Sequence, residues 1–553
     1  MATISAAAGD QEEWQPAPHE RSPIPGSPPI PWHPPVRRMA YALVAVLVLM
    51  AGSLGNAIVA ANLTTLQGSL GLYQAEIQWL PTVYVMTNVS ANLVLIKFRQ
   101  QFGIRLFTQI FLILFALTTA AHLLTHNFAT AVAVRAISGI AAAACSTIGF
   151  LYMVQVSTPE HRLKMIVVAI TLPQTAIPLA RLFPSEAFEP DRWQTMYLFE
   201  LGLALASLAA VRLLALPPVQ RLKTFEKMDF VTFPFFAGGM ALLCAVLGMG
   251  RTLWWFEAPW IAPALIGAAI LLPIAFFIEH NRRNPLLNTR WLASGDILRF
   301  ALVSILVRVV LSEQSIGASG LLSVVGMGAD QIRMLYLVVL LATLAGAVVS
   351  ALTIDPLFLG RPILIALALI CVGALLDSHS TNLTRPHDMY VSQALLGFAT
   401  ALFIGPAMMV GLTRALAHGP THFVSFFAMF SITQNVGSLF GSAMLGTFQV
   451  VRERVHSADI AANLVAADPQ IVQRVQQNAS AYGRVLVDPA LRQAEGAAIL
   501  AQQASREANI LAYNDVFLLI AAIAAGTILW ASVHIMRVRR DNLARAAEQA
   551  GAK

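Results

Sequence analysis

The hydrophobic residues of this chain form long unbroken runs that are separated by shorter polar segments. A helix needs roughly 20 residues to cross a hydrocarbon layer about 30 Å thick, and most of the runs reach that length. The runs do not alternate with a period of two residues, which argues against the strands of a membrane barrel. The pattern predicts fourteen membrane-spanning helices, which we place at residues 39–62, 76–96, 106–124, 128–154, 164–184, 194–214, 230–249, 259–278, 298–324, 334–354, 362–378, 389–413, 422–449 and 513–536.

The composition agrees with this pattern. Of the 553 residues, 57% are hydrophobic and 12% are charged, whereas ordinary soluble domains carry about 25% charged residues. A soluble chain of this length would need several cores with polar surfaces between them. The expected fold class is therefore an all-α polytopic membrane protein.

Charge asymmetry between the loops predicts the orientation. If the N-terminus is cytoplasmic, most of the Lys and Arg residues fall in inner loops, and the outer loops hold Glu186, Glu189, Asp191 and Asp377. Because basic residues are retained on the cytoplasmic side, we expect both termini in the cytoplasm. The net charge of +7 then anchors loops beside an anionic leaflet and does not predict nucleic-acid binding.

Three segments lie outside the predicted spans. Residues 1–38 are a Pro-rich cytoplasmic tail that we expect to be disordered, residues 452–512 form one long outer loop, and residues 538–553 are a second cytoplasmic tail. The three cysteines, Cys145, Cys244 and Cys371, fall inside spans, so we expect no disulfide, no metal site and no cofactor.

Six motifs, in order and spread over nearly the whole chain, resemble one transporter family. They are "FATAVAVRAISGIAAA" (128–143), "FEKMDF" (225–230), "FFIEHNRRNPLLNTRWLASGDILR" (276–299), "SQALLGFATALFIGP" (392–406), "VRERVH" (451–456) and "LAQQASREANILAYNDVF" (500–517). Together they resemble the 14-span drug:proton antiporters of the major facilitator superfamily, in the EmrB-like branch.

The resemblance implies two six-helix bundles, residues 39–214 and 298–537, joined by a linker with two extra spans at residues 215–297. It implies a substrate cavity between the bundles that opens alternately to each side. It also implies a bacterial-type inner-membrane carrier, not an enzyme, that exports amphipathic, aromatic or anionic toxic compounds in exchange for protons. A periplasmic adaptor and an outer-membrane channel are the expected partners of that branch.

The chain departs from the family pattern in its first span. The position of the usual aspartate falls on Gly55, followed by Asn56, and an amide cannot take up and release a proton near neutral pH. The loop at 95–105 keeps Gly103 and Arg105 but has Gln100 at the place of an acid. Coupling by the usual carboxylate is therefore not available to this chain.

Other charged residues lie within the predicted spans. They include Arg135, Glu200, Arg308 and Glu313. Because a charge at the bilayer centre costs roughly 3 kcal/mol, we expect these four to face the bundle interior, whereas Arg181 is expected to reach the outer headgroups. Arg308 and Glu313 lie about 140° apart around one helix and should not pair with each other. Glu200 and Glu313 are candidates for proton coupling, with a static ion pair or a solvated position as alternatives. Arg135 and Arg308 are candidates for substrate binding, with structural pairing as the alternative.

Uncharged residues complete the candidate set. Asn56, Gln393 and Gln434 either contact the substrate or bond a neighbouring helix. Five positions are conformational candidates: Gly103, Arg105, Gly139, Gly437 and Gly441. Gly437 and Gly441 lie four residues apart on one helix face, where small residues let helices approach closely.

Three functions remain after this reading. The first is a proton-driven exporter, or a carrier that is not coupled to protons. The second is an assembly component whose main element is the long loop at 452–512. The third, a membrane-embedded enzyme, has little support, because His122 and His126 lack the third ligand that a zinc site needs.

Overall fold

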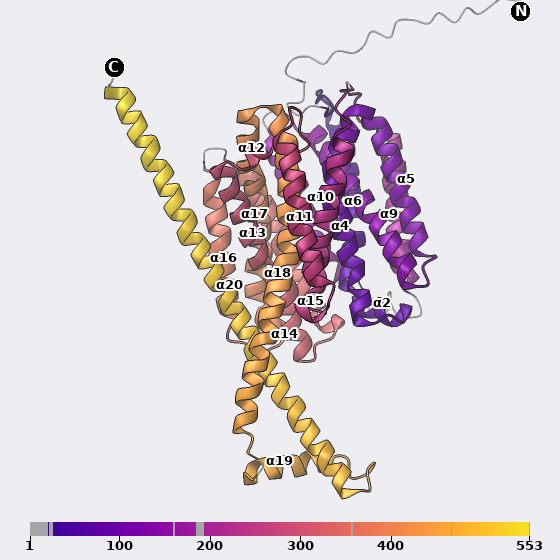
Figure 1. Cartoon of the computed structure of the whole chain (residues 1–553), viewed down its shortest axis with the longest axis vertical. Coiled ribbons are helices and arrows are strands. Elements are labelled where there is room, and N and C mark those ends of the chain that lie inside the picture. Colours follow the sequence, from indigo (N-terminus) through magenta and orange to yellow (C-terminus); the bar gives the residue numbers. More distant parts are fainter. Residues whose placement is uncertain are drawn as a thin grey trace, which may run out of the picture.

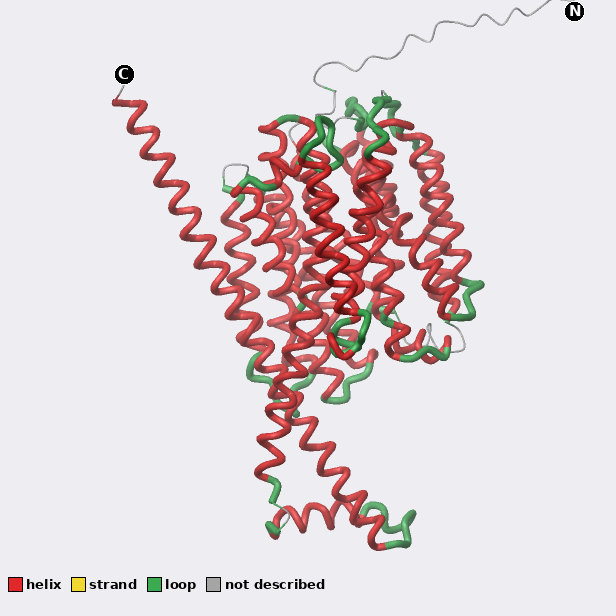
Figure 2. Tube along the Cα trace, viewed as in Figure 1, coloured by secondary structure: helices red, strands yellow, loops and turns green. Residues whose placement is uncertain are grey.

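The computed structural model describes residues 20, 26–158, 161–183, 193–219, 221–355, 358–465 and 467–551. These residues form a bundle of long helices, from which a helical hairpin projects at one end (Figure 1). In the part of the chain that is described, all regular structure is helical (Figure 2). The predicted polytopic all-helical fold class is therefore confirmed.

Thirteen helices among the described residues are long and apolar enough to cross a membrane. Most begin and end close to the predicted spans, but the last two extend well beyond their predicted bounds. The fifth is broken into three pieces because Pro173 and Pro178 interrupt it. The helices that build them are α1 (Pro35–Ala61), α3 (Gln74–Ile77) with α4 (Trp79–Phe102), α5 (Ile104–His122), α6 (Phe128–Val156), α7 (Arg162–Thr171) with η2 (Leu172–Thr175) and α8 (Ala176–Ala180), α9 (Gln194–Leu213), α10 (Asp229–Met249), α11 (Ile261–His280), α15 (Ala329–Thr353), α16 (Gly360–Asp377), η7 (Pro386–Met389) with α17 (Tyr390–His418), α18 (Pro420–Asn463) and α20 (Pro489–Gly551).

The expected ninth span is not one continuous α-helix. It consists of α13 (Gly295–Leu311), the π-helical turn η6 (Gln314–Ala318) and α14 (Ser319–Val324). The longest of these pieces, α13, has 17 residues. The count of fourteen spans therefore stays a prediction. A π-turn inside a helix often marks a functional position.

Helix packing groups the spans into two sets. In the first, α1 and α4 pack on α6, and α5 packs on α6 and α9. In the second, α15 and α16 pack on α17, and α18 packs on α13 and α20. Helices α10 and α11 pack on each other, and α10 also packs on α4. The short helices α2 (Leu63–Leu70) and α12 (Thr289–Leu292) lie at opposite ends of the bundle (Figure 1).

Residues 26–34, which we call the strap, correct part of the expectation that residues 1–38 are disordered. Residues 27–30 and His33 are buried against the bundle, at the end where α12 lies, and α1 begins at Pro35. Ile30 is 6% exposed and belongs to the same hydrophobic cluster as Trp291 of α12. The strap orders because it buries apolar surface and finds partners for its backbone. Residues 1–19 and 21–25 of the expected tail lie outside the described residues.

The expected outer loop at 452–512 is mostly helical. Helix α18 continues to Asn463, α19 spans Pro469–Ser480, and α20 begins at Pro489. These three helices form the hairpin that projects from the end opposite the strap (Figure 1). Below we call the two ends of the bundle the strap end and the hairpin end.

Candidate transport site

Arg135 is the centre of a buried polar cluster in the first set of helices. It lies on α6, is 1% exposed, and its Nη2 donates a hydrogen bond to Asn56 Oδ1 on α1 at 2.6 Å. Its guanidinium group lies over the ring of Tyr84 on α4, 4.7 Å from the centroid. Among the described residues, Arg135 Nε and Nη1 have no hydrogen-bond partner. The arginine therefore faces the protein interior and keeps spare donors.

Glu200 fills the space that Gly55 leaves open. It lies on α9 and is 4% exposed. It is near enough to Arg135 for their opposite charges to attract each other. A Cβ atom at Gly55 would lie 2.1 Å from Glu200 Oε1 and 2.4 Å from its Cδ. A side chain at position 55 would have to displace this carboxylate. The Glu200 carboxylate therefore lies beside the position where the resembled family carries its first-span acid.

Arg308 links the two sets of helices. It lies on α13, its Nε donates to the backbone carbonyl of Gln434 at 3.2 Å, and its Nη1 donates to Gln174 Oε1 at 3.4 Å. Gln174 belongs to η2 in the first set, and Gln434 to α18 in the second. Among the described residues, neither side-chain polar atom of Gln434 has a partner. Arg308 is half-buried, so it is not sealed within a core.

Glu313 belongs to a second buried cluster, which the sequence analysis did not find. It is fully buried where α13 gives way to η6. Gln393 Nε2 on α17 donates to Glu313 Oε1 at 3.0 Å and to Asp377 Oδ2 on α16 at 2.8 Å. Within the described chain no cation forms a salt bridge to either carboxylate. Asp377 had been placed in an outer loop, so the only available signal was its position at a helix end.

The candidate glycines lie at close helix contacts. A Cβ atom at Gly139 would lie 2.4 Å from the carbonyl oxygen of Tyr84, and one at Gly437 would lie 2.9 Å from Arg308 Cβ. At Gly441 the nearest atom, Ser312 Oγ, would be 2.5 Å away. Gly103 has φ = +87° between α4 and α5, in a region that favours glycine. The conformational roles of these residues stay predictions.

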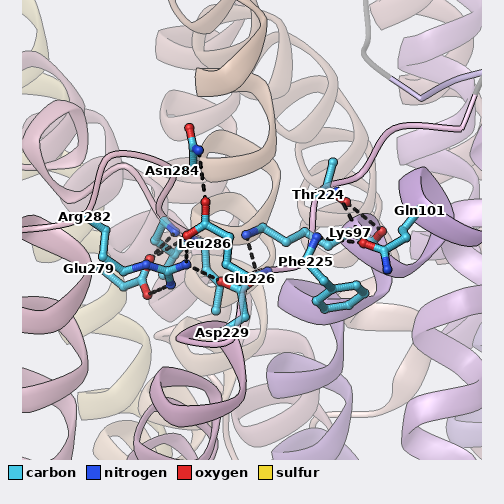
Figure 3. Close-up of polar contacts among 11 residues, drawn as sticks. Lys97, Gln101, Thr224, Phe225, Glu226, Asp229, Glu279, Arg282, Asn284 and Leu286 are labelled. Atoms are coloured by element: carbon cyan, nitrogen blue, oxygen red, sulfur yellow. Dashed lines mark hydrogen bonds and ion pairs between the residues drawn. The ribbon is translucent and has the colours of Figure 1, made fainter.

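A set of five charged residues, which we call the linker hub, joins the two extra helices to α4 (Figure 3). Lys97 Nζ donates to Asp229 Oδ2 at 2.8 Å, and Arg282 contacts Asp229 Oδ1 at 2.7 Å. Arg282 also contacts Glu279 and Glu226. Hydrogen bonds from Asn284 and Arg282 hold the pKa of Glu226 below its ordinary value. The hub lies where α4, α10 and α11 meet.

The sequence candidates are thus brought together in part. Asn56, Arg135 and Glu200 belong to one cluster, Glu313 and Gln393 to another, and Arg308 contacts the backbone of Gln434. Within the described part of the chain, no hydrogen bond or ion pair joins these three groups. Arg105 lies apart from all of them, at the start of α5.

The comparison with known proteins decides the family. The family model of the Major Facilitator Superfamily matches residues 43–442, more than half of the chain. The chain belongs to the Major Facilitator Superfamily. It is therefore a multi-pass secondary transporter of that type, a class whose members carry small molecules across the lipid bilayer and are not enzymes.

The similarity between this superfamily member and known proteins extends over nearly its whole length. It is 22% identical over 516 residues to the uncharacterized MFS-type transporter YhcA of Bacillus subtilis (strain 168), covering 90% of this chain and 93% of that one. The structure of the human organic anion transporter MFSD10 (TETRAN) has a TM-score of 0.52 at 14% identity, over 89% of this chain and 100% of that one. The proton:xylose symporter XylE has a TM-score of 0.49 at 14% identity, over 88% and 95% of the two chains. At these identities the similarity in structure concerns the fold.

Proposed function

We propose that this transporter exports amphipathic compounds with an aromatic or anionic part across a bacterial inner membrane, by exchange with protons and alternating access. In this proposal the strap end faces the cytoplasm, and the resemblance to the EmrB-like drug:proton antiporters supplies the direction of transport. The single observation that supports it most is the carboxylate of Glu200 at the position that Gly55 leaves empty.

Proton antiport requires that cargo and proton compete for one group. In its ionised form, Glu200 can accept a hydrogen bond from an N–H or O–H of the cargo, and protonation removes that acceptor. The same carboxylate, when ionised, offsets the charge of Arg135, which otherwise lies buried with two free nitrogens. Both side chains are almost fully buried in this structure, so the cargo would reach them in another state of the cycle.

An anionic group on the cargo fits Arg308. Its guanidinium contacts side chains and backbone from both sets of helices, at the interface where the two bundles must separate during transport. The side-chain amide of Gln434, whose backbone carbonyl accepts from Arg308, has no hydrogen-bond partner among the described residues and could supply a neutral donor and acceptor. Binding there would couple the occupancy of the site to the movement of both bundles.

The pair of Glu313 and Asp377 is a second candidate for proton binding. Two carboxylates that share one amide group repel each other unless a proton is kept between them. Gln393 would then position the pair and not contact the cargo. In this proposal Glu313 is either a second coupling site or a fixed buried pair, and the effect of Glu313→Gln on transport distinguishes the two.

The experiment measures cargo-dependent pH changes inside proteoliposomes that contain the purified transporter. When carboxyfluorescein or ethidium is added outside, its entry should drive protons out and raise the internal pH. Glu200→Gln should abolish the pH change, and the exposed control Glu257→Gln should keep it. Arg308→Ala should weaken the response to anionic carboxyfluorescein more than the response to cationic ethidium. A full pH response in Glu200→Gln would contradict the proposed coupling.

The hairpin favours a second role, in assembly with a periplasmic adaptor. Helices α18 and α20 cross where they leave the bundle, and Arg452 and His456 of α18 both contact Asp515 of α20 there, at 2.6 and 2.7 Å. Further out the two helices diverge, and α19 packs on α20 (Figure 1). A stiffened projection of this kind is suited to contact with a helical partner. Deletion of residues 464–488 should abolish co-purification with such an adaptor while the proteoliposome response persists. Loss of both would show that the hairpin is needed for the carrier itself.

A further inference from the structure

The strap is held on the first set of helices at one end of the molecule. Gln155, the penultimate residue of α6, is 1% exposed, and its Nε2 donates to the carbonyl of Pro29 at 3.0 Å. Its Oε1 lies 3.2 Å from His33 Nε2. Both polar atoms of one buried side chain are therefore used by the strap. Burial lowers the pKa of His33 below its ordinary value.

The start of the strap is held at a second place. Arg99, near the end of α4, is 5% exposed, and its Nη2 donates to Ser27 Oγ at 3.3 Å. A Cβ atom at Gly26 would lie 2.4 Å from Gln100 Cγ, and Gly26 has φ = +68°, so glycine is required there. The strap thus spans from α4 to α6 across the strap end.

The middle of the strap enters a hydrophobic cluster that contains both bundles. Ile30 shares this cluster with Val154 and Ile166 of the first set and with Leu359 and Met408 of the second. In an alternating-access carrier the bundles must separate at this end when it opens. Separation would part this cluster, to which Ile30 belongs.

We propose that the strap stabilises the closed strap end, because Gln155 and Arg99 hold Ile30 in a cluster that must part when the transporter opens there. This rests on the proposed alternating access. It predicts that the wild-type protein is closed at this end most of the time, and that weakening the strap shifts the population towards the open state. Gln155 would be a positioning residue of the closed state and would not contact cargo.

The test measures how fast a buried cysteine is labelled at the strap end. In a background with Cys145→Ala, Cys244→Ala and Cys371→Ala, Ile166→Cys is exposed to a membrane-impermeant maleimide in detergent, without cargo or pH gradient. Deletion of residues 2–31 should raise the labelling rate by at least about tenfold, the change that about 1.4 kcal/mol produces in a population. Deletion of residues 2–19, which leaves the strap in place, should not change it.

A point variant covers the case in which the longer deletion does not fold. Gln155→Leu keeps the side-chain volume but removes both contacts with the strap, and it should raise the labelling rate in the same direction. Unchanged labelling in Gln155→Leu and in every folded deletion would overturn the proposal. Because labelling needs no transport, this result is separate from the failure or success of proton antiport.

A separate cavity carries a second inference. It lies within the first set of helices at the strap end, has a volume of about 220 Å³, and is formed by α5, α6 and α9. Its charged lining residues are Arg105 at the start of α5 and Arg212 at the end of α9. Neither guanidinium forms a hydrogen bond or an ion pair within the described part of the chain. The remaining lining includes the polar Thr108 and Gln109 and the apolar Leu112, Leu208, Val211 and Leu216.

This lining matches a phosphate group attached to an apolar chain. Two unpaired arginines attract a phosphate and repel each other in its absence, and Arg is well suited to phosphate oxygens. The cavity lies beside the strongly exposed Leu213 and the exposed Leu106, side chains that face lipid in a membrane. We infer that the cavity binds the phosphate group of an anionic amphiphile, such as a phospholipid headgroup.

The test follows the melting temperature of the purified protein with three probes. Dihexanoyl-phosphatidylglycerol should raise it more than dihexanoyl-phosphatidylcholine, and the difference should vanish in Arg105→Ala/Arg212→Ala but persist in the exposed control Lys227→Ala. An equal effect of inorganic phosphate would identify a soluble anion as the ligand of the same site. Equal effects of the two lipids in wild type, with none from phosphate, would overturn the inference. So would a lipid difference that persists in the double variant.

Discussion

Substitution of Gly55 by alanine tests whether the position of the Glu200 carboxylate depends on the absence of a side chain at residue 55. The added Cβ would lie 2.1 Å from Glu200 Oε1, whereas ordinary contacts begin at 3.4 Å. The carboxylate would therefore have to withdraw by about 1 Å or more, within a helix contact that has no spare room. Overpacking of this kind destabilises a fold by about 1–3 kcal/mol.

The assay is the free energy of unfolding of the purified protein in detergent, measured with a chemical denaturant, together with the proteoliposome pH response. Gly55→Ala should lose about 1–3 kcal/mol of stability and most of its activity. Gly202→Ala on the same helix as Glu200 is the matched control, because a Cβ there would meet open space. It should change stability by less than about 1 kcal/mol.

A double variant separates the steric effect from other consequences. In Gly55→Ala/Glu200→Ala the group that clashes with the new Cβ is absent, so the two substitutions should not add, with a coupling energy of about 0.5–3 kcal/mol. Gly55→Asp/Glu200→Ala moves the carboxylate to the first span and should recover part of the pH response that Glu200→Ala loses. If Gly55→Ala were as stable and as active as the wild type, the proposed placement of the Glu200 carboxylate would be refuted.

Two further substitutions test the other buried clusters. Gln393→Leu removes the donor that Glu313 and Asp377 share. It should lower the free energy of unfolding by about 1–3 kcal/mol for each acceptor left without a partner. Stability equal to wild type would argue that the two carboxyls bond each other directly through a proton. Lys97→Met leaves Asp229 without one of its two cationic partners and should lower the free energy of unfolding by about 1.5–3 kcal/mol. Lys97→Arg, which keeps the charge, should lower it less. An effect of the same size in both variants would mean that packing, and not charge, holds this contact.

Burial of the charged span residues was predictable, but their partners were not. The cost of a charge in hydrocarbon is enough to place Arg135 and Glu200 inside the bundle, where the structure has them. That Glu200 lies against Gly55 depends on how α9 packs on α1. Because those positions are 145 residues apart in sequence, no local pattern could show this contact.

Two other features show the same limit. The Pro-rich composition of residues 26–34 predicts an unfolded tail. This prediction fails because Gln155 and Arg99 of the bundle bind the strap, and composition alone does not reveal such partners. The sequence does not predict that Glu313 and Asp377 share Gln393, because Asp377 lies at the very edge of its predicted span, where a loop position is expected. A buried binding site for the strap, or an amide shared by two carboxylates, is formed by several helices together and cannot be seen in one segment of sequence.

The sequence by itself determined that this chain is a bundle of membrane-spanning helices and which ionisable groups avoid lipid, since both follow from the length and polarity of single segments in a hydrocarbon solvent. The packing of distant helices determines which of those groups meet, that the strap is held on α4 and α6, and that the ninth segment contains a π-turn. These depend on close packing between distant helices, where a glycine or a single amide determines which neighbour can approach.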